Sequence, residues 1–249
     1  MKYFTLIFLL FSSYFMKAQE NSYSFDTESG SEITIYPIYH GSLVIEFQEE
    51  RIVVDPFGGA QRYEQFDGFD TVIITDIHGD HFNPSTLEGL NLKNAQIIAP
   101  QAVIETNKDT ALVSKMKRMD NGGNRDMGKW QISAIPMYNL PDDSSSRHKK
   151  GRGNGYILHF EDKTLYISGD TEDIVEMRNL KGVDLAFVCM NLPYTMDINQ
   201  ASSAVLEFLP KRVIPYHYRG SEMSNIEAFK ELVNSESDAV EVILMDWYN

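Results

Sequence analysis

One short segment limits the possible folds more than any other. Residues Thr71–Thr75 read Thr-Val-Ile-Ile-Thr, an apolar run without a charged or strongly polar interruption. Such a run is typical of a β-strand that is buried on both faces. The sheet that contains this strand therefore needs other elements packed over each of its faces.

The rest of the chain predicts short strands in the first half and strands alternating with helices in the second. Further strands are expected at Glu32–Ile38, Leu43–Phe47, Arg51–Val54, Gln96–Ala99, Ile132–Pro136, Tyr156–Phe160, Thr164–Ser168, Asp184–Val188, Arg212–Pro215 and Val240–Met245. Helices are expected at Thr86–Leu92, Ala102–Asn107, Ile198–Leu209 and Asn225–Val233, and a turn cluster at Asp120–Gly128. No sequence repeat or linker-like segment interrupts this order, so we expect residues 20–249 to form a single α/β domain in which helices cover sheet faces.

The first nineteen residues have the composition of a secretory signal peptide. Lys2 precedes the apolar run Tyr3–Met16, and Lys17, Ala18 and Gln19 follow it. The run is shorter than the roughly 20 apolar residues that span a bilayer. We therefore expect residues 1–19 to be cleaved, leaving a periplasmic or secreted protein without stable membrane insertion. The alternative is an uncleaved anchor.

The charge balance and the single cysteine narrow the function. The chain has 36 acidic and 22 basic residues, and an acidic surface repels nucleic-acid phosphates, so we expect a small-molecule substrate and no nucleic-acid partner. Cys189 is the only cysteine, which excludes a disulfide framework and a multi-cysteine zinc module. Any metal must therefore be held by His, Asp and Glu. The sequence does not indicate an oligomeric state.

The densest group of metal-competent side chains directly follows the buried strand. Asp76, His78, Asp80 and His81 lie within six residues. One metal cannot be reached by all four without strain, so two metals sharing this loop is the natural geometry. The alternative is a polar turn with solvated acids and histidines.

Three later residues extend this pattern at strand ends. Asp170 follows an apolar strand and a glycine, and one carboxylate can bridge two cations separated by about 3.5–4 Å. It is equally suited to cap a helix that starts near Glu172. His217 ends another strand, where it is either a ligand or a core histidine. His148 lies in a polar loop and is a ligand or a solvated side chain.

Together these motifs resemble the metallo-β-lactamase superfamily of metal-dependent hydrolases, most closely its ascorbate-phosphate-lactonase-like and phospholipase-D-like branch. The resemblance covers about Glu32 to His217 and rests on His40-Gly41-Ser42 with Asp55-Pro56, Asp76-x-His78-x-Asp80-His81, Gly169-Asp170-Thr171, Pro193-Tyr194-Thr195-Met196 and Pro215-Tyr216-His217. It implies an αββα sandwich, two mixed sheets covered by helices, with two divalent metals at one sheet edge. By position, it implies that His78 binds the first metal, that Asp80, His81 and His217 bind the second, and that Asp170 bridges them. A further first-site histidine is expected between the Asp76–His81 loop and Gly169; His159 lies in an alternating strand, so we choose His148.

One position departs from the superfamily pattern. Asp76 stands where the resemblance implies the first histidine of an HxHxDH motif. Either Asp76 is a ligand through oxygen, which would favour harder ions such as manganese, or the first site is weaker and one metal suffices. Zinc, which also accepts carboxylates, is the expected metal, with manganese as the alternative.

The resemblance implies metal-assisted hydrolysis of an ester, lactone or phosphodiester. A water between the metals would be deprotonated near neutral pH and attack the substrate, with Asp80 orienting it and His40 supporting the pocket. Asn139 and Tyr194 are candidate pocket residues. The cations Arg147, Lys149, Lys150 and Arg152 around His148 would attract an anionic substrate. The alternatives are a metal-binding envelope module with little catalysis and a di-iron oxidoreductase.

Overall fold

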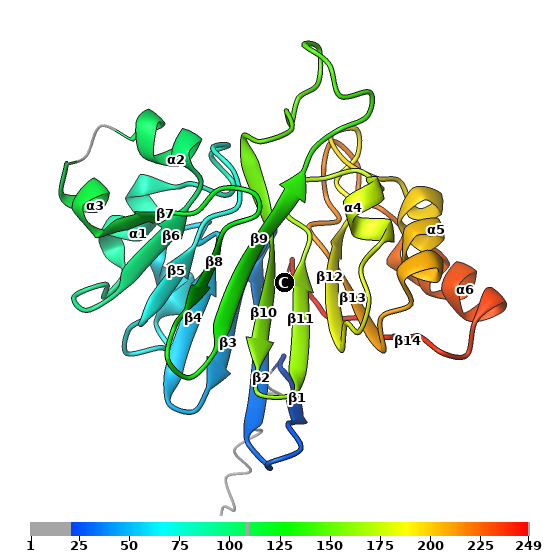
Figure 1. The fold of residues 1–249 in the computed structure, drawn as a ribbon, viewed down its shortest axis with the longest axis horizontal. Helices are drawn as coiled ribbons and strands as arrows, with labels where there is room; N and C mark the ends of the chain where they lie inside the picture. The colour runs from blue at the N-terminus through cyan, green and yellow to red at the C-terminus, as the bar shows by residue number, and fades with distance from the viewer. Residues whose placement is uncertain (1–20, 108–109, 249) are drawn as a thin grey trace, which may run out of the picture.

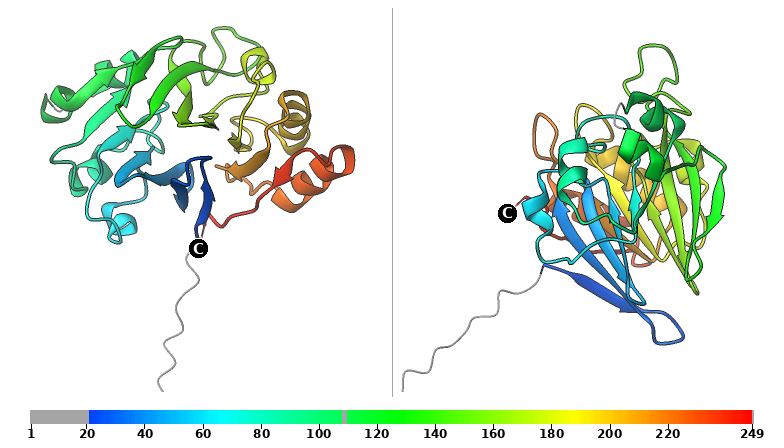
Figure 2. Two further views of the ribbon diagram at one scale, coloured as in Figure 1. Left: turned by 60° about the horizontal axis from the view of Figure 1, so that its bottom comes forward. Right: turned by 90° about the vertical axis from the view of Figure 1, so that its left-hand side faces the viewer.

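Two seven-stranded sheets pack face to face, with helices on their outer sides (Figures 1 and 2). The computed structural model describes residues 21–107 and 110–248, so the predicted signal peptide at residues 1–19 lies outside the described residues. This architecture confirms the predicted αββα sandwich of two mixed sheets. In the described part of the chain, no helix is long and apolar enough to cross a membrane.

The two sheets have the same internal order. In each, the first four strands along the chain are antiparallel and the fourth to seventh are parallel. The first sheet comprises β1 (Tyr23–Asp26), β2 (Glu32–Tyr39), β3 (Ser42–Phe47), β4 (Glu50–Val54), β5 (Thr71–Ile73), β6 (Gln96–Ala99) and β7 (Met116–Arg118). The second comprises β8 (Asn124–Asp126), β9 (Gln131–Met137), β10 (Gly153–Phe160), β11 (Lys163–Ile167), β12 (Leu185–Cys189), β13 (Arg212–Tyr216) and β14 (Glu241–Val242). The fold thus contains a structural repeat that no sequence repeat reveals.

The helices divide between the two outer faces, as Figure 2 shows. One side carries η1 (Ala60–Tyr63), α1 (Pro84–Gly89), α2 (Gln101–Thr106) and α3 (Thr110–Lys115). The other carries α4 (Val175–Arg178), α5 (Ile198–Phe208) and α6 (Ile226–Glu236). The start of α5 is fixed by a capping box, in which Asp197 accepts from the Gln200 backbone and the Gln200 side chain accepts from the Asp197 backbone.

Alternation along the strands explains why both faces of the first sheet are apolar. Leu43 and Ile45 of β3 belong to the core between the sheets, whereas Val44 belongs to the core under the helices. The same division separates Ile73 from Val72 in β5, where every residue is buried. The prediction that this strand is covered on both faces is confirmed.

Several boundaries differ from the sequence predictions. The turn cluster at Asp120–Gly128 contains the short strand β8, and the strand expected at Val240–Met245 shrinks to β14. Strands β1 and β7 are not among the predicted elements, because each is short and half-exposed or exposed along most of its length. The helix expected near Glu172 begins instead at Val175, with Ile174 at its N-cap, so the helix-capping alternative for Asp170 is wrong.

Candidate metal centre

Side chains from five separate loops meet at one edge of the two sheets. His40 lies between β2 and β3, and the Asp76–His81 loop follows β5. His148 lies in the β9–β10 loop, the green segment that projects at the top of Figure 1. Asp170 follows β11 and His217 follows β13. The carboxyl ends of parallel strands are the usual place for ligand sites in such sheets.

Asp170 lies at the centre of this convergence. Its Oδ2 is 3.2 Å from His81 Nε2 and 3.2 Å from His148 Nε2, and its Oδ1 is 3.2 Å from His217 Nε2. All four side chains are buried. Burial opposes ionisation of this carboxyl, but His217 and His81 hold its pKa well below the ordinary value. Asp170 is therefore a carboxylate placed between three imidazoles.

A second buried carboxylate sets the orientation of His81. Asp55 Oδ2 lies 2.7 Å from His81 Nδ1, and Asp55 Oδ1 accepts from the Thr75 backbone over 2.8 Å. Because Asp55 accepts the Nδ1 proton, Nε2 of His81 faces Asp170. Burial alone would lower the pKa of His81, but Asp170 and Asp55 raise it well above the ordinary value. Carboxylate support of this kind is common behind metal-binding histidines.

An amide performs the same task for His148. Asn139 Oδ1 accepts from the His148 backbone over 2.8 Å and lies 2.9 Å from His148 Nδ1. The Asn139 amide nitrogen in turn donates to Glu172 and to the Tyr194 backbone. Asn139 thus holds His148 in place and does not line the pocket, whereas Tyr194 does.

A further set of donors contains Asp76, the residue that stands where the superfamily pattern has a histidine. Its Oδ2 lies 2.8 Å from His78 Nδ1, and Asp76, His78 and His148 offer ligand atoms within 4.8 Å of one another. Arg152 makes two hydrogen bonds to the same carboxylate. Burial opposes ionisation of Asp76, but His78, His81 and Arg152 outweigh it and lower its pKa to about 2.

Asp80 and His40 form a separate contact at the mouth of the site. His40 Nε2 lies 3.2 Å from Asp80 Oδ2, and His217 Nε2 lies 3.5 Å from the same oxygen. His40 Nδ1 is 3.0 Å from the Tyr248 hydroxyl. Burial lowers the pKa of His40, so its neutral form donates from Nε2 to Asp80 and accepts at Nδ1 from Tyr248.

The backbone around these residues is strained and closely packed. His40, Asp55 and His217 have positive φ angles of 59°, 44° and 47°. Non-glycine residues in this region cluster at functional sites. Gly41 permits the approach of His217, because a Cβ at position 41 would lie 3.0 Å from His217 Cδ2.

The donor set fits divalent metal ions. His148 Nε2 lies 3.2 Å from Asp170 Oδ2, and Asp170 Oδ1 lies 3.2 Å from His217 Nε2, but among the described residues neither His148 Nε2 nor Asp170 Oδ1 has a partner in hydrogen-bond geometry. His81 Nε2 and His217 Nε2 lie 3.2 Å apart, so two imidazole nitrogens face the same point. A cation bound among His81, Asp170 and His217, or among Asp76, His78 and His148, would satisfy these atoms.

A pocket of about 220 Å³ lies against this donor set and reaches it at His78, Asp80 and Asp170. Its lining includes His40, His78, Asp80, Arg147, Tyr194 and Arg219. Of the four cations predicted around His148, only Arg147 lines this pocket. Lys150 instead pairs with Glu176, and Arg152 with Asp76.

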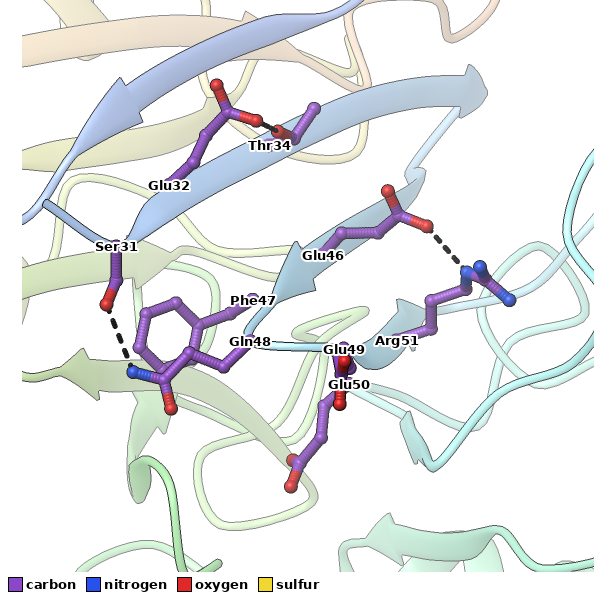
Figure 3. Close-up of a pocket in the computed structure, with 9 residues that line it drawn as sticks. All are labelled: Ser31, Glu32, Thr34, Glu46, Phe47, Gln48, Glu49, Glu50 and Arg51. Atoms are coloured by element: carbon purple, nitrogen blue, oxygen red, sulfur yellow. Dashed lines mark hydrogen bonds and ion pairs between the residues drawn. The ribbon is translucent and has the colours of Figure 1, made fainter.

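A different hollow of about 400 Å³ lies in the first sheet at the start of β2, the end of β3 and the start of β4, away from the β2–β3 turn that carries His40 (Figure 3). Glutamates dominate its wall, and Arg51 pairs there with Glu46. No histidine lines it, so its chemistry differs from that of the strand-end site.

The structure thus brings together every residue predicted for the site. They are Asp76, His78, Asp80, His81, His148, Asp170, His217 and His40. Sequence reasoning missed the parts played by Asp55, Arg152 and Tyr248. Asp55 stands in one of the sequence motifs, but its contact with His81 joins residues 26 positions apart, and Tyr248 meets His40 from 208 positions away.

Comparisons with known proteins agree with this geometry. The family described as "Beta-lactamase superfamily domain" matches residues 34–217. A UPF0173 metal-dependent hydrolase of Nanoarchaeum equitans is 29% identical over 216 residues, covering 83% of this chain and 94% of that protein. A crystal structure of a metal-dependent hydrolase from Parabacteroides distasonis has a TM-score of 0.80 and 35% identity, covering 90% of this chain and 97% of that one. The structure of Igni18, a metallo hydrolase from Ignicoccus hospitalis, has a TM-score of 0.72 at 22% identity, covers 87% of this chain and 96% of that one, and shows the fold alone. This chain belongs to the metallo-β-lactamase superfamily and is one of its metal-dependent hydrolases.

Proposed function

We propose that this hydrolase uses two divalent ions to cleave an ester, lactone or phosphodiester of a small molecule, and that zinc is the preferred metal. The observation that carries the proposal is the position of Asp170. Its Oδ2 is equally close to His81 and His148, which belong to the two different donor groups. A carboxylate shared in this way suits a pair of neighbouring cations.

The donor types favour zinc over manganese. Four imidazoles, from His78, His81, His148 and His217, face the centre together with carboxylates. Imidazole suits zinc, whereas manganese prefers oxygen donors. The oxygen of Asp76 keeps manganese as the second candidate.

Divalent ions held here would lower the pKa of a coordinated water and polarise the bond to be cleaved. The residues of the chain position the reactants. The carboxylate of Asp80 lies at the pocket wall, where it is able to accept a hydrogen bond from the attacking water. His40 holds Asp80 in this orientation, and Tyr248 holds His40 through its other ring nitrogen.

The test is a hydrolysis assay on metal-stripped and reconstituted protein. The panel contains 4-nitrophenyl esters, a lactone and bis(4-nitrophenyl) phosphate, each with zinc or manganese added. We expect turnover of at least one class only after reconstitution, and its loss in Asp80→Ala. No metal-dependent turnover of any member would contradict the proposal.

Two histidines provide a matched pair of variants. His148→Asn removes a donor beside Asp170, whereas His159→Asn alters a half-buried histidine of β10 that contacts Thr164. We expect only the first variant to lose activity. Equal effects of the two would contradict the assignment of His148.

Export is a separate proposal. The basic and apolar character of residues 1–19 supports cleavage and a periplasmic or secreted location. N-terminal sequencing of the mature protein, after fractionation of cells that express the full chain, tests it. An intact Met1 in the cytoplasmic fraction would contradict it.

A further inference from the structure

We propose that Arg147 and Arg219 together bind an anionic group, a carboxylate or a phosphate, that the substrate carries away from its scissile bond. This inference rests on the proposed hydrolase function and adds a substrate class to it.

The two arginines come from different parts of the fold to one pocket. Arg147 lies in the β9–β10 loop, and Arg219 lies two residues beyond His217. Both line the pocket that His78, Asp80 and Asp170 also line. A substrate whose reactive bond lies at the strand-end donors therefore extends toward these two side chains.

Both arginines are free to bind an anion. In the described parts of the chain, neither has a carboxylate oxygen within the 4.0 Å of an ion pair. Most arginines here behave differently: Arg51, Arg118 and Arg178 each pair with an acidic side chain. In a chain of net charge −14, two unpaired guanidinium groups at one pocket are a local exception to the acidic surface.

Aromatic rings position both guanidinium groups. The Arg147 guanidinium lies 4.3 Å from the centre of the Tyr194 ring, and that of Arg219 lies 5.6 Å from the centre of the Tyr248 ring. A guanidinium that lies against a ring face keeps N–H groups that point away from the ring, and these match the two oxygens of a carboxylate or phosphate. Ser221, two residues beyond Arg219, also lines this pocket.

The experiment compares esters that differ in one distal group. The substrates are 4-nitrophenyl butyrate, mono-4-nitrophenyl glutarate and 4-nitrophenyl 4-phosphonobutyrate, assayed with the zinc-loaded enzyme. We expect kcat/KM to favour at least one anionic ester by about tenfold or more, the size expected for a charged hydrogen bond. In the double variant Arg147→Gln/Arg219→Gln we expect the ratio of kcat/KM for the anionic ester to kcat/KM for the neutral ester to fall below about twofold. The change is mainly in KM, because the lost contacts bind the substrate and the transition state equally well. Lys149→Gln is the matched control, since Lys149 is exposed on the same loop and does not line the pocket.

Several outcomes would overturn the inference. They are equal kcat/KM values for the neutral and anionic esters, a preference that survives in the double variant, or the same loss in Lys149→Gln. If the wild type hydrolyses none of the esters, the proposed function fails on these substrates. The inference is then tested by the affinity for glutarate, measured by calorimetry. Binding that weakens about tenfold in the double variant supports it, and binding that does not weaken contradicts it.

Discussion

Arg152 and Asp76 form a two-point ion pair beside the strand-end donors. Arg152 Nε donates to Asp76 Oδ1 over 3.1 Å, and Nη2 donates to Oδ2 over 2.9 Å. The side chain of Asp76 is fully buried and that of Arg152 is 19% exposed. The pair is neutral as a unit, so Arg152 cancels the charge that Asp76 brings to the group of Asp76, His78 and His148.

This pair predicts how the metal-free protein responds to Arg152→Met. Removing one partner of a buried ion pair leaves an uncompensated charge, so we expect a loss of about 3 kcal/mol in the free energy of unfolding. A divalent ion beside Asp76 would offset much of that loss. Urea denaturation with a chelator and with added zinc measures both effects, with Lys149→Met as the control. An equal loss with and without zinc would show that Asp76 lies outside the metal site.

The lowered pKa of Asp76 predicts a pH dependence of stability in the metal-free state. The folded pKa of about 2 lies below the ordinary 3.8, so ionised Asp76 stabilises the fold above pH 4. That contribution, about 2 kcal/mol, is lost as the pH falls from 4 through 2. The difference in unfolding free energy between wild type and Asp76→Asn should shrink over this window. A difference that stays constant from pH 6 to pH 2 would refute it.

The supports of His81 and His148 predict matched losses of metal affinity. Asp55→Asn disturbs the Nδ1 contact of His81, and Asn139→Leu removes that of His148. Losing such a support typically weakens metal binding by about 10- to 100-fold. Competition with a chromophoric chelator should show one weakened zinc position in each variant. Two unaffected positions in either variant would argue against that histidine as a ligand.

Two glycines of the site loops offer a steric test. In Gly41→Ala the new methyl would meet the His217 ring at 3.0 Å, so His217 must shift and zinc affinity should fall. A methyl at Gly79, between His78 and Asp80, would meet no atom within 4 Å, so Gly79→Ala should bind zinc nearly as the wild type does. Titration of both variants under identical conditions compares them. Equal affinities would show that the approach of His217 to Gly41 is not needed.

The sequence predicted the parts of this site that depend on local order. Polar side chains directly after apolar runs marked the strand ends, and the alternation around His159 placed that residue in a strand and left His148 as the candidate. The buried run at Thr71–Thr75 required cover on both faces, which the structure shows.

The sequence did not predict the contacts between distant segments. On sequence alone Arg152 is a cation for the substrate, because nothing local shows that it reaches Asp76, 76 positions earlier. Tyr248 lies in a C-terminal segment without periodicity, and only the folded chain brings its hydroxyl to His40. For Asp170 the local sequence cannot separate two roles, because an Asp that follows a strand and precedes a polar turn fits a helix N-cap and a metal ligand equally well.

The metal content of the purified protein tests the central claim most directly. Elemental analysis should find two equivalents of zinc, or of manganese, per chain in the wild type, and a clear loss in Asp170→Ala, whose carboxylate lies between both donor groups. Circular dichroism of the same samples checks that the variant is folded. A folded Asp170→Ala protein that retains the full metal content would contradict the claim that these strand ends form one metal centre.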